Sequence, residues 1–288
     1  MSGVAGADRI KSRSDYDRFF ASYRKLIANF PGFVDMRSSG SYNSDETKQD
    51  FGDMDLIVLM ASDQDKVAVK RELQSFFQKQ PMDVITAFTS EKHAGRRTYN
   101  AGELVSVRYN DPDIGYSIQI DNIVAMNTLE AEFKQQLLDM PAEKQGLILA
   151  LIKIATVETN AAVLFDKLGI IACSALTGDQ EYEFNLSSVG LTLRRVAYVP
   201  GTYREANRED VWFSQDFTDV ARLLYQYDLD AEFAELLVRG KQVIRNSRSH
   251  RRVNGIFNSM ITVKSGEVGT AKGDKKLAAQ LKVNEAFK

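Results

Sequence analysis

The hydrophobic pattern of the first 125 residues changes period several times, which predicts helices and strands in turn. Apolar side chains recur at helical spacing from Tyr16 to Phe30, and again at Val69, Leu73 and Phe76. Each set falls on one side of a helix, so each predicted helix has a face that packs into a core.

Short apolar runs separate the two predicted helices and follow the second one. They predict strands at 33–38, 54–60 and 82–88, and a hairpin in which 104–109 pairs with 116–124. The order helix, strand, polar loop, strand, helix and three strands is typical of an α+β domain with a mixed sheet.

The pattern becomes mainly helical from residue 128 onward. The run 147–155 is apolar nearly all round, which places it in a core, and 217–227 and 231–238 are amphipathic. The range 181–199 is compatible with two further strands. We therefore expect a disordered start (1–14), an α+β domain (15–127), a mostly helical domain (128–245) and a basic, partly flexible tail (246–288).

Composition narrows the possible chemistry. The chain has 288 residues, enough for two domains, and its one cysteine and two distant histidines exclude an intramolecular disulfide and a Cys/His zinc site. Any bound metal must therefore use oxygen ligands. No apolar run is long enough to span a bilayer and the N-terminus has no signal pattern, so we expect a cytoplasmic protein that does not bind membranes.

The net charge of −2 is unevenly distributed along the chain. Residues 239–288 carry 12 Lys or Arg against 3 Asp or Glu, which amounts to +9 and leaves −11 on the rest. This segment is a candidate for binding nucleic acid or another anion. The alternative is a solvated terminus with no binding role.

Two acids open the most apolar of the predicted strands. Asp53 and Asp55 flank Met54, and because side chains alternate along a strand, both carboxylates project from the same side. Buried like charges repel, so this pair is costly unless a cation neutralises it. Magnesium prefers carboxylates and substrate phosphates as ligands, and the pair is therefore a candidate magnesium site that manganese could also occupy.

A Gly-Ser pair lies upstream of these acids. Gly40 lets the backbone approach an anion closely, and Ser41 offers a hydroxyl at the expected start of a helical turn. The arrangement suits the β- and γ-phosphates of a nucleoside triphosphate such as ATP. A Gly-Ser pair alone is usually only a turn, so its value lies in the combination with the two acids.

The combined pattern, Gly-Ser followed about ten residues later by Asp-x-Asp at the head of an apolar strand, resembles the signature of DNA-polymerase-β-type nucleotidyltransferases. The nearest pattern is that of oligoadenylate synthases, cyclic-dinucleotide synthases, poly(A) polymerases and CCA-adding enzymes. The resemblance implies two magnesium ions on Asp53 and Asp55, with the triphosphate at Gly40 and Ser41. It covers about residues 15–165 and is most specific over 40–55.

The resemblance also implies a third carboxylate on a neighbouring strand. Asp121 is favoured because Ser117, Gln119 and Asp121 form a polar face of the hairpin strand. Asp83, in the predicted strand directly after the second helix, is the alternative. Either residue could otherwise be an ordinary acid at the end of a strand.

A second similarity concerns Lys153 in the apolar run 147–155. The run is similar to the helix that opens the helical domain in these enzymes, where a lysine faces the triphosphate. A lone lysine in an apolar helix must otherwise reach solvent. The aromatic residue that commonly follows in the family is missing from this chain.

These observations predict transfer of a nucleoside monophosphate from a nucleoside triphosphate to an acceptor hydroxyl, without a template. The basic tail favours an RNA or tRNA 3′ end as the acceptor. Synthesis of a cyclic or linear oligonucleotide second messenger is the enzymatic alternative. A catalytically silent relative that binds nucleotide or nucleic acid is the other alternative.

Overall fold

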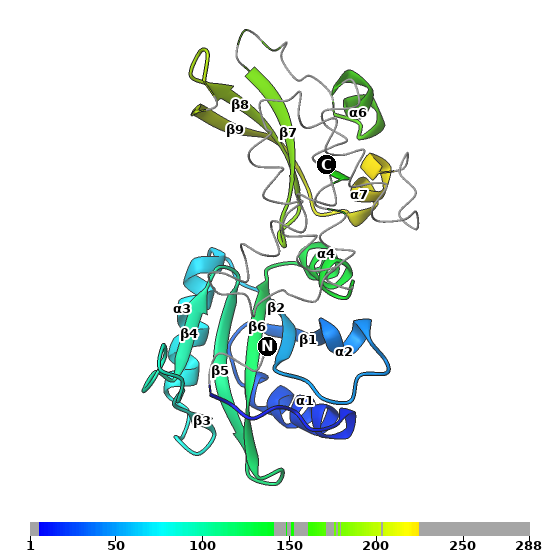
Figure 1. Cartoon of the computed structure of the whole chain (residues 1–288). Helices are drawn as coiled ribbons and strands as arrows, with labels where there is room; N and C mark the ends of the chain where they lie inside the picture. The colour runs from blue at the N-terminus through cyan, green and yellow to red at the C-terminus, as the bar shows by residue number, and fades with distance from the viewer. Residues whose placement is uncertain are drawn as a thin grey trace, which may run out of the picture. The chain divides into compact units, whose positions relative to one another are not determined.

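The computed structural model describes residues 6–140, 148, 151–152, 161–170, 176, 178, 180–202 and 204–224 (Figure 1). The chain forms two compact units, Met1–Pro141 and Ala142–Lys288. The first unit is α+β, with helices packed on a mixed sheet, as the sequence predicts.

The sheet of the first unit has six strands, and its main path runs β1-β2-β6-β5-β3, with β4 also paired to β5. Strands β2 and β6 are parallel, and the other pairs are antiparallel. The elements are α1 (Arg13–Ile27), β1 (Phe33–Ser39), α2 (Ser41–Ser44), β2 (Met54–Met60), α3 (Lys66–Gln78), β3 (Ile85–Thr86), β4 (Thr98–Ala101), β5 (Leu104–Asp111), β6 (Tyr116–Ala125) and α4 (Thr128–Leu138).

Helices α1 and α3 pack on one face of the sheet, here called the apolar face, which carries Met54, Leu56 and Val58 of β2. Each helix begins at a residue whose side chain caps it, because Ser12 accepts a hydrogen bond from a first-turn N–H and Asp65 does the same. The aromatic and aliphatic stripes of both helices are buried there, as their spacing predicts.

The residues just before α1 are ordered, although the sequence predicted disorder up to residue 14. Ile10 has no exposed surface and pairs with Phe51, and Asp8 pairs with Ile118 of β6. This short segment is polar around one apolar residue, and only its partners elsewhere in the chain give it a fixed place.

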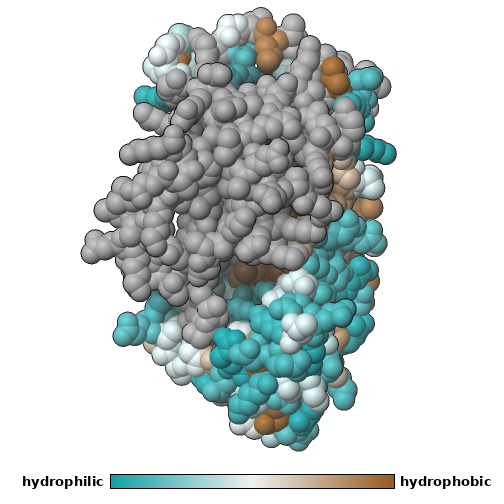
Figure 2. Space-filling model, turned by 45° about the vertical axis from the view of Figure 1, so that its right-hand side comes forward, coloured by the Kyte–Doolittle hydropathy of each residue, from teal (hydrophilic) through white to brown (hydrophobic). Residues whose placement is uncertain are grey.

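Helix α4 packs on the opposite face of the sheet. Its Ala131 meets Ile57 and Leu59 of β2 and Ala125 of β6 in a second apolar cluster. This helix lies within the unit Met1–Pro141, whereas the sequence interpretation began the second domain before it, at residue 128. Hydrophilic side chains predominate on the part of this unit that is visible in Figure 2, and most of its buried residues are apolar.

A network of four charges anchors α4 to the rest of the first unit. Lys134 is fully buried and lies 2.9 Å from Glu103 and 3.1 Å from Glu130. Lys66, at the first turn of α3, also pairs with both glutamates. Two positive and two negative charges balance in this network, as buried ions require.

Two details of the strands differ from the prediction. The strand expected at 82–88 is reduced to β3, because the turn after α3 bonds the N–H groups of Val84 and Ile85 to the carbonyl of Pro81. Strand β4 was not predicted, since its sequence Thr-Tyr-Asn-Ala lacks apolar alternation.

The described part of the second unit contains a three-stranded antiparallel sheet. Its elements are α6 (Ala161–Lys167), β7 (Gln180–Leu186), β8 (Leu191–Tyr198), β9 (Glu205–Ser214) and α7 (Phe217–Leu224). Strands β7 and β8 are the two expected from the sequence, whereas the largely exposed β9 was missed. The predicted helix at 231–238 and the basic tail lie outside the described residues. None of the helices in the described part of the chain is long and apolar enough to cross a membrane.

Candidate active site

Two of the predicted metal ligands lie side by side in the sheet. Asp55 of β2 is in register with Asp121 of the parallel strand β6. Ser39 of β1 is opposite Asp55, and Ser106 of β5 is opposite Asp121. The four residues form a row across four strands on the face opposite the apolar face, here called the carboxylate face.

Asp53 completes a cluster of three carboxylates. Burial, and then the charges of Asp53 and Asp121, raise the pKa of Asp55 to about 7. Burial followed by the charge of Asp121 raises the pKa of Asp53, and burial raises that of Asp121. The three acids are therefore close enough for each ionised group to oppose ionisation of its neighbours.

Neighbouring polar groups hold Asp121 in place. The amide Nε2 of Gln119 donates to both carboxylate oxygens, at 3.0 and 3.1 Å, and hydrogen bonding by Gln119 and Ser106 opposes the effect of burial on the pKa of Asp121. Within the described residues, the buried Oε1 of Gln119 and the buried Oγ of Ser39 have no hydrogen-bond partner. One unsatisfied oxygen thus lies beside Asp55 in the row of four residues, and the other lies two residues before Asp121 on β6.

Gly40 is pressed against Asp55. Its φ of 73° and ψ of −142° lie in a region that only glycine adopts readily. A Cβ at this position would lie 2.6 Å from Oδ2 of Asp55. Both the backbone conformation and the close approach require glycine at this position. The turn at Gly40 therefore packs directly against the carboxylate of Asp55.

A fourth carboxylate, Asp139, holds the turn at Gly40 through hydrogen bonds. It accepts hydrogen bonds from the N–H of Gly40 at 3.0 Å, from Asn43 at 2.8 Å and from Gln135 at 3.2 Å. Asp139 is the C-cap of α4, where the partial negative charge of the helix end disfavours an acid. The three donors offset that cost and tie α4 to the Gly40 turn.

Ser41 begins the short helix α2, as the sequence predicts. Its Oγ accepts a hydrogen bond from the ammonium group of Lys48 at 2.7 Å. The charge of Lys48 opposes the rise that burial and the neighbouring carboxylates cause in the pKa of Asp53 and Asp55. The sequence interpretation missed Lys48, and the only available signal was a lone lysine in the polar loop between the Gly-Ser pair and the acids.

The remaining predicted residues are not part of this cluster. Asp83 is exposed, in the turn before β3, and β3 pairs with β5 rather than with β2. The structure thus brings Asp121, and not Asp83, beside Asp55. Lys153 lies outside the described residues.

The residues of the cluster suit a hydrated magnesium ion in ligand type. All three carboxylates are hard oxygen donors, and the unpaired oxygens of Ser39 and Gln119 can accept hydrogen bonds from metal-bound water. Within the described part of the chain, no three His, Cys, Asp or Glu side chains are already arranged as a metal-binding group.

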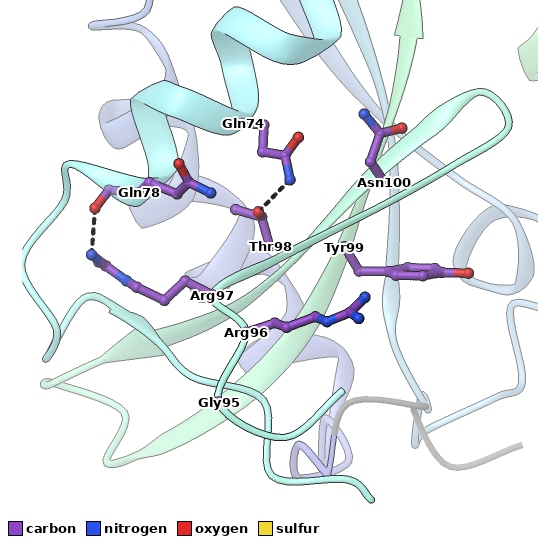
Figure 3. A pocket seen from close by; sticks show the side chains of 8 residues that line it. All are labelled: Gln74, Gln78, Gly95, Arg96, Arg97, Thr98, Tyr99 and Asn100. Carbon is purple, nitrogen blue, oxygen red and sulfur yellow. Dashed lines mark hydrogen bonds between the residues drawn. The ribbon is translucent and has the colours of Figure 1, made fainter. Parts of the chain in front are cut away.

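A separate pocket lies beside β4 and α3 rather than at the carboxylates. It has a volume of about 570 Å³, and Figure 3 shows its lining, which is Gln74, Gln78, Gly95, Arg96, Arg97, Thr98, Tyr99 and Asn100. None of the acids discussed above lines it.

Comparison of the chain with protein-family models finds no match, and none of the curated proteins compared with it matches either.

Proposed function

We propose that the protein is a magnesium-dependent nucleotidyltransferase of the DNA-polymerase-β type. The observation that carries the proposal is the register of Asp55 with Asp121 on adjacent parallel strands, with Asp53 beside them. A buried acid beside a partly buried one in the neighbouring strand is costly without a cation, and here the Gly40 turn packs directly on Asp55.

Each residue has a distinct role in this proposal. Asp53, Asp55 and Asp121 would hold two magnesium ions, which lower the pKa of an acceptor hydroxyl and stabilise the charge of the pyrophosphate leaving group. Lys48 and Ser41 contact each other, and together they offer a positive charge and a hydroxyl to a triphosphate.

The raised pKa of Asp55 has a consequence for cation binding. With a pKa of about 7, Asp55 is partly protonated at neutral pH in the metal-free protein. Cation binding requires the carboxylate form, so it must release protons and strengthen as the pH rises from 6 to 8. The rate of the reaction would likewise increase as the pH rises from 6 to 8.

The acceptor we favour is an RNA or tRNA 3′ end. This choice is supported by the positive charge of residues 239–288, which contain 12 Lys or Arg and 3 Asp or Glu. A nucleotide acceptor would make the protein a synthase of cyclic or linear oligonucleotides, and no transfer at all would make it a silent nucleotide-binding relative.

One incubation separates these functions. The full chain is mixed with Mg²⁺ and each nucleoside triphosphate labelled at the α-phosphate, with and without bulk tRNA, and the products are resolved as RNA, small molecules or protein. We expect label in RNA, dependent on tRNA and Mg²⁺.

Asp55→Asn and Asp83→Asn serve as a matched pair in this experiment, because each removes one carboxylate but only Asp55 belongs to the cluster. Label transfer that survives Asp55→Asn would reject the proposed site. Complete absence of transfer with every nucleotide and acceptor would favour the silent relative.

A further inference from the structure

The pocket beside β4 has a lining of unusual composition. Its side chains comprise two arginines, three carboxamides, a threonine and one aromatic ring, and no Asp or Glu lines it. A pocket with donors and cations but no carboxylate favours an anionic ligand. The presence of an aromatic ring adds a flat surface on which a planar group can stack.

The two arginines of this pocket are in different situations. Arg97 donates to the backbone carbonyls of Gln78 and Gln80 and, at 3.1 Å, to that of Ile85, so its guanidinium joins the end of α3 to β3. Arg96 is exposed, and its guanidinium makes no hydrogen bond or ion pair with the described residues. Figure 3 shows the two side chains pointing to opposite sides. The Arg97 side chain is therefore a fixed part of the pocket lining, whereas the guanidinium of Arg96 is available to contact a ligand.

The aromatic ring belongs to Tyr99, which is half-buried and packs against a second ring. Its ring centroid lies 4.3 Å from that of His93, which in turn packs edge-on against Phe88 at 6.2 Å. His93 is only 4% exposed, and neither ring nitrogen has a hydrogen-bond partner in the described part of the chain. Burial lowers the pKa of His93, which favours the neutral form of its ring. The ring that packs against Tyr99 is therefore uncharged.

The position of Tyr99 connects this pocket to the carboxylates. Tyr99 of β4 is opposite Ser106 of β5, which is opposite Asp121 of β6. All three side chains therefore lie on the carboxylate face, and two strand spacings separate the Cα atoms of Tyr99 and Asp121 by about 10 Å. One or two nucleotides of an extended strand can bridge this distance.

We propose that the pocket binds single-stranded nucleic acid, with a base stacked on Tyr99 and a backbone phosphate on Arg96. Aromatic stacking combined with a cation is the usual basis of single-strand binding. The site deepens the proposed function, because it would hold the acceptor strand on the same face as Asp121.

The test measures binding without the reaction. Fluorescence anisotropy of labelled RNA and DNA oligomers of about eight nucleotides is recorded with the full chain in the absence of nucleoside triphosphate and Mg²⁺. We expect Tyr99→Ala to weaken binding by about 5- to 100-fold and Tyr99→Phe to retain most of it, because the ring remains. Arg96→Ala should weaken binding and make the salt dependence shallower by about 0.7 in log–log slope.

Arg18→Ala is the matched control, since it removes an exposed arginine from α1 and should leave affinity unchanged. Hydrogen exchange supplies a second readout: the peptide spanning 91–101 should be protected by the oligomers in the wild type and much less in Tyr99→Ala. Wild-type affinity in both pocket variants, or no protection of 91–101, would overturn the proposal. The binding assay contains no reaction, so its failure is distinguishable from failure of label transfer, and a preference for RNA over DNA would identify the 2′-hydroxyl as part of the recognition.

Discussion

The two faces of the first unit's sheet are built from the same strands but have opposite physical characters. On the apolar face, Met54, Leu56 and Val58 have no exposed surface and pack against α1 and α3. On the carboxylate face, the intervening Asp55 has Asp121 as its neighbour. Burial of apolar surface stabilises the fold by roughly 25 cal/mol per Å², whereas burial of adjacent carboxylates opposes it.

Polar groups on the two faces differ in the same way. Asn122 of β6 is buried on the apolar face, where it accepts from the Tyr23 hydroxyl at 2.8 Å and donates to the Val105 carbonyl at 2.9 Å. Gln119 Oε1 and Ser39 Oγ, on the carboxylate face, have no such partner within the described residues. The comparison teaches that both faces contribute apolar contacts to stability, whereas the acids and their unpaired oxygen neighbours are gathered on the carboxylate face, where a ligand can satisfy them.

The sharpest contrast between the faces is expected from two adjacent residues. Asp55→Asn should reduce nucleotidyl transfer by ~10²-fold or more without loss of stability, because it removes a proposed metal ligand and a repelling charge. Leu56→Ala should instead lower the free energy of unfolding by about 2–5 kcal/mol, because it opens a cavity in the core. Transfer assays and urea unfolding of both variants check this, and a similar stability loss in both would remove the distinction.

The third carboxylate is expected to be as important as the first two. Asp121→Asn should match Asp55→Asn in its loss of transfer, because the two acids share one site in register. Asp83→Asn should retain nearly full activity, because Asp83 is an exposed turn residue. Steady-state rates measured with Mg²⁺ decide the ranking, and the reverse order would show that Asp121 is only structural.

Gly40 should be intolerant of a side chain for two separable reasons. Gly40→Ala should lower transfer by about 10-fold or more and the free energy of unfolding by about 1–3 kcal/mol, because the new Cβ displaces Asp55 and strains the backbone. Gly115→Ala is the matched control, since Gly115 has a φ of 82° with open space around it. Equal activity loss in both variants would mean that the contact of Gly40 with Asp55 is unimportant.

The smallest expected effect is the pH dependence of stability. The pKa of Asp55 is about 7 in the folded protein, against an ordinary value of 3.8. Between these values the folded state holds a proton that the unfolded state has lost, so stability falls as the pH rises from 4 to 8. Asp55→Asn should therefore raise Tm relative to the wild type at pH 8 without Mg²⁺, and not at pH 4.

Thermal melts at both pH values, with and without Mg²⁺, measure this difference. Mg²⁺ should raise the Tm of the wild type more than that of Asp55→Asn at pH 8, because binding the folded state stabilises it. A Tm difference that is the same at both pH values would show that repulsion among the carboxylates is not its cause.

Several features of this protein follow from the sequence alone. The spacing of Tyr16, Phe19 and Tyr23 defines the buried stripe of α1, and the apolar run after Asp53 defines β2 within its observed bounds. The same local alternation placed Asp121 on the polar side of its strand. These are short-range properties, because a helix or strand period is visible within a few residues.

The tertiary structure alone decided which of these pieces meet. The choice of Asp121 over Asp83 depends on β6 lying beside β2, and the links of Lys48 to Ser41 and of Asp139 to Gly40 are single contacts with no periodic signal. Strand β4, with Tyr99 on the same face as Asp121, also needed its partner β5 to be recognised. Local periodicity determines which face a side chain occupies, but hydrogen bonding between distant segments determines its neighbours, because strand order is not encoded in the period of any one strand.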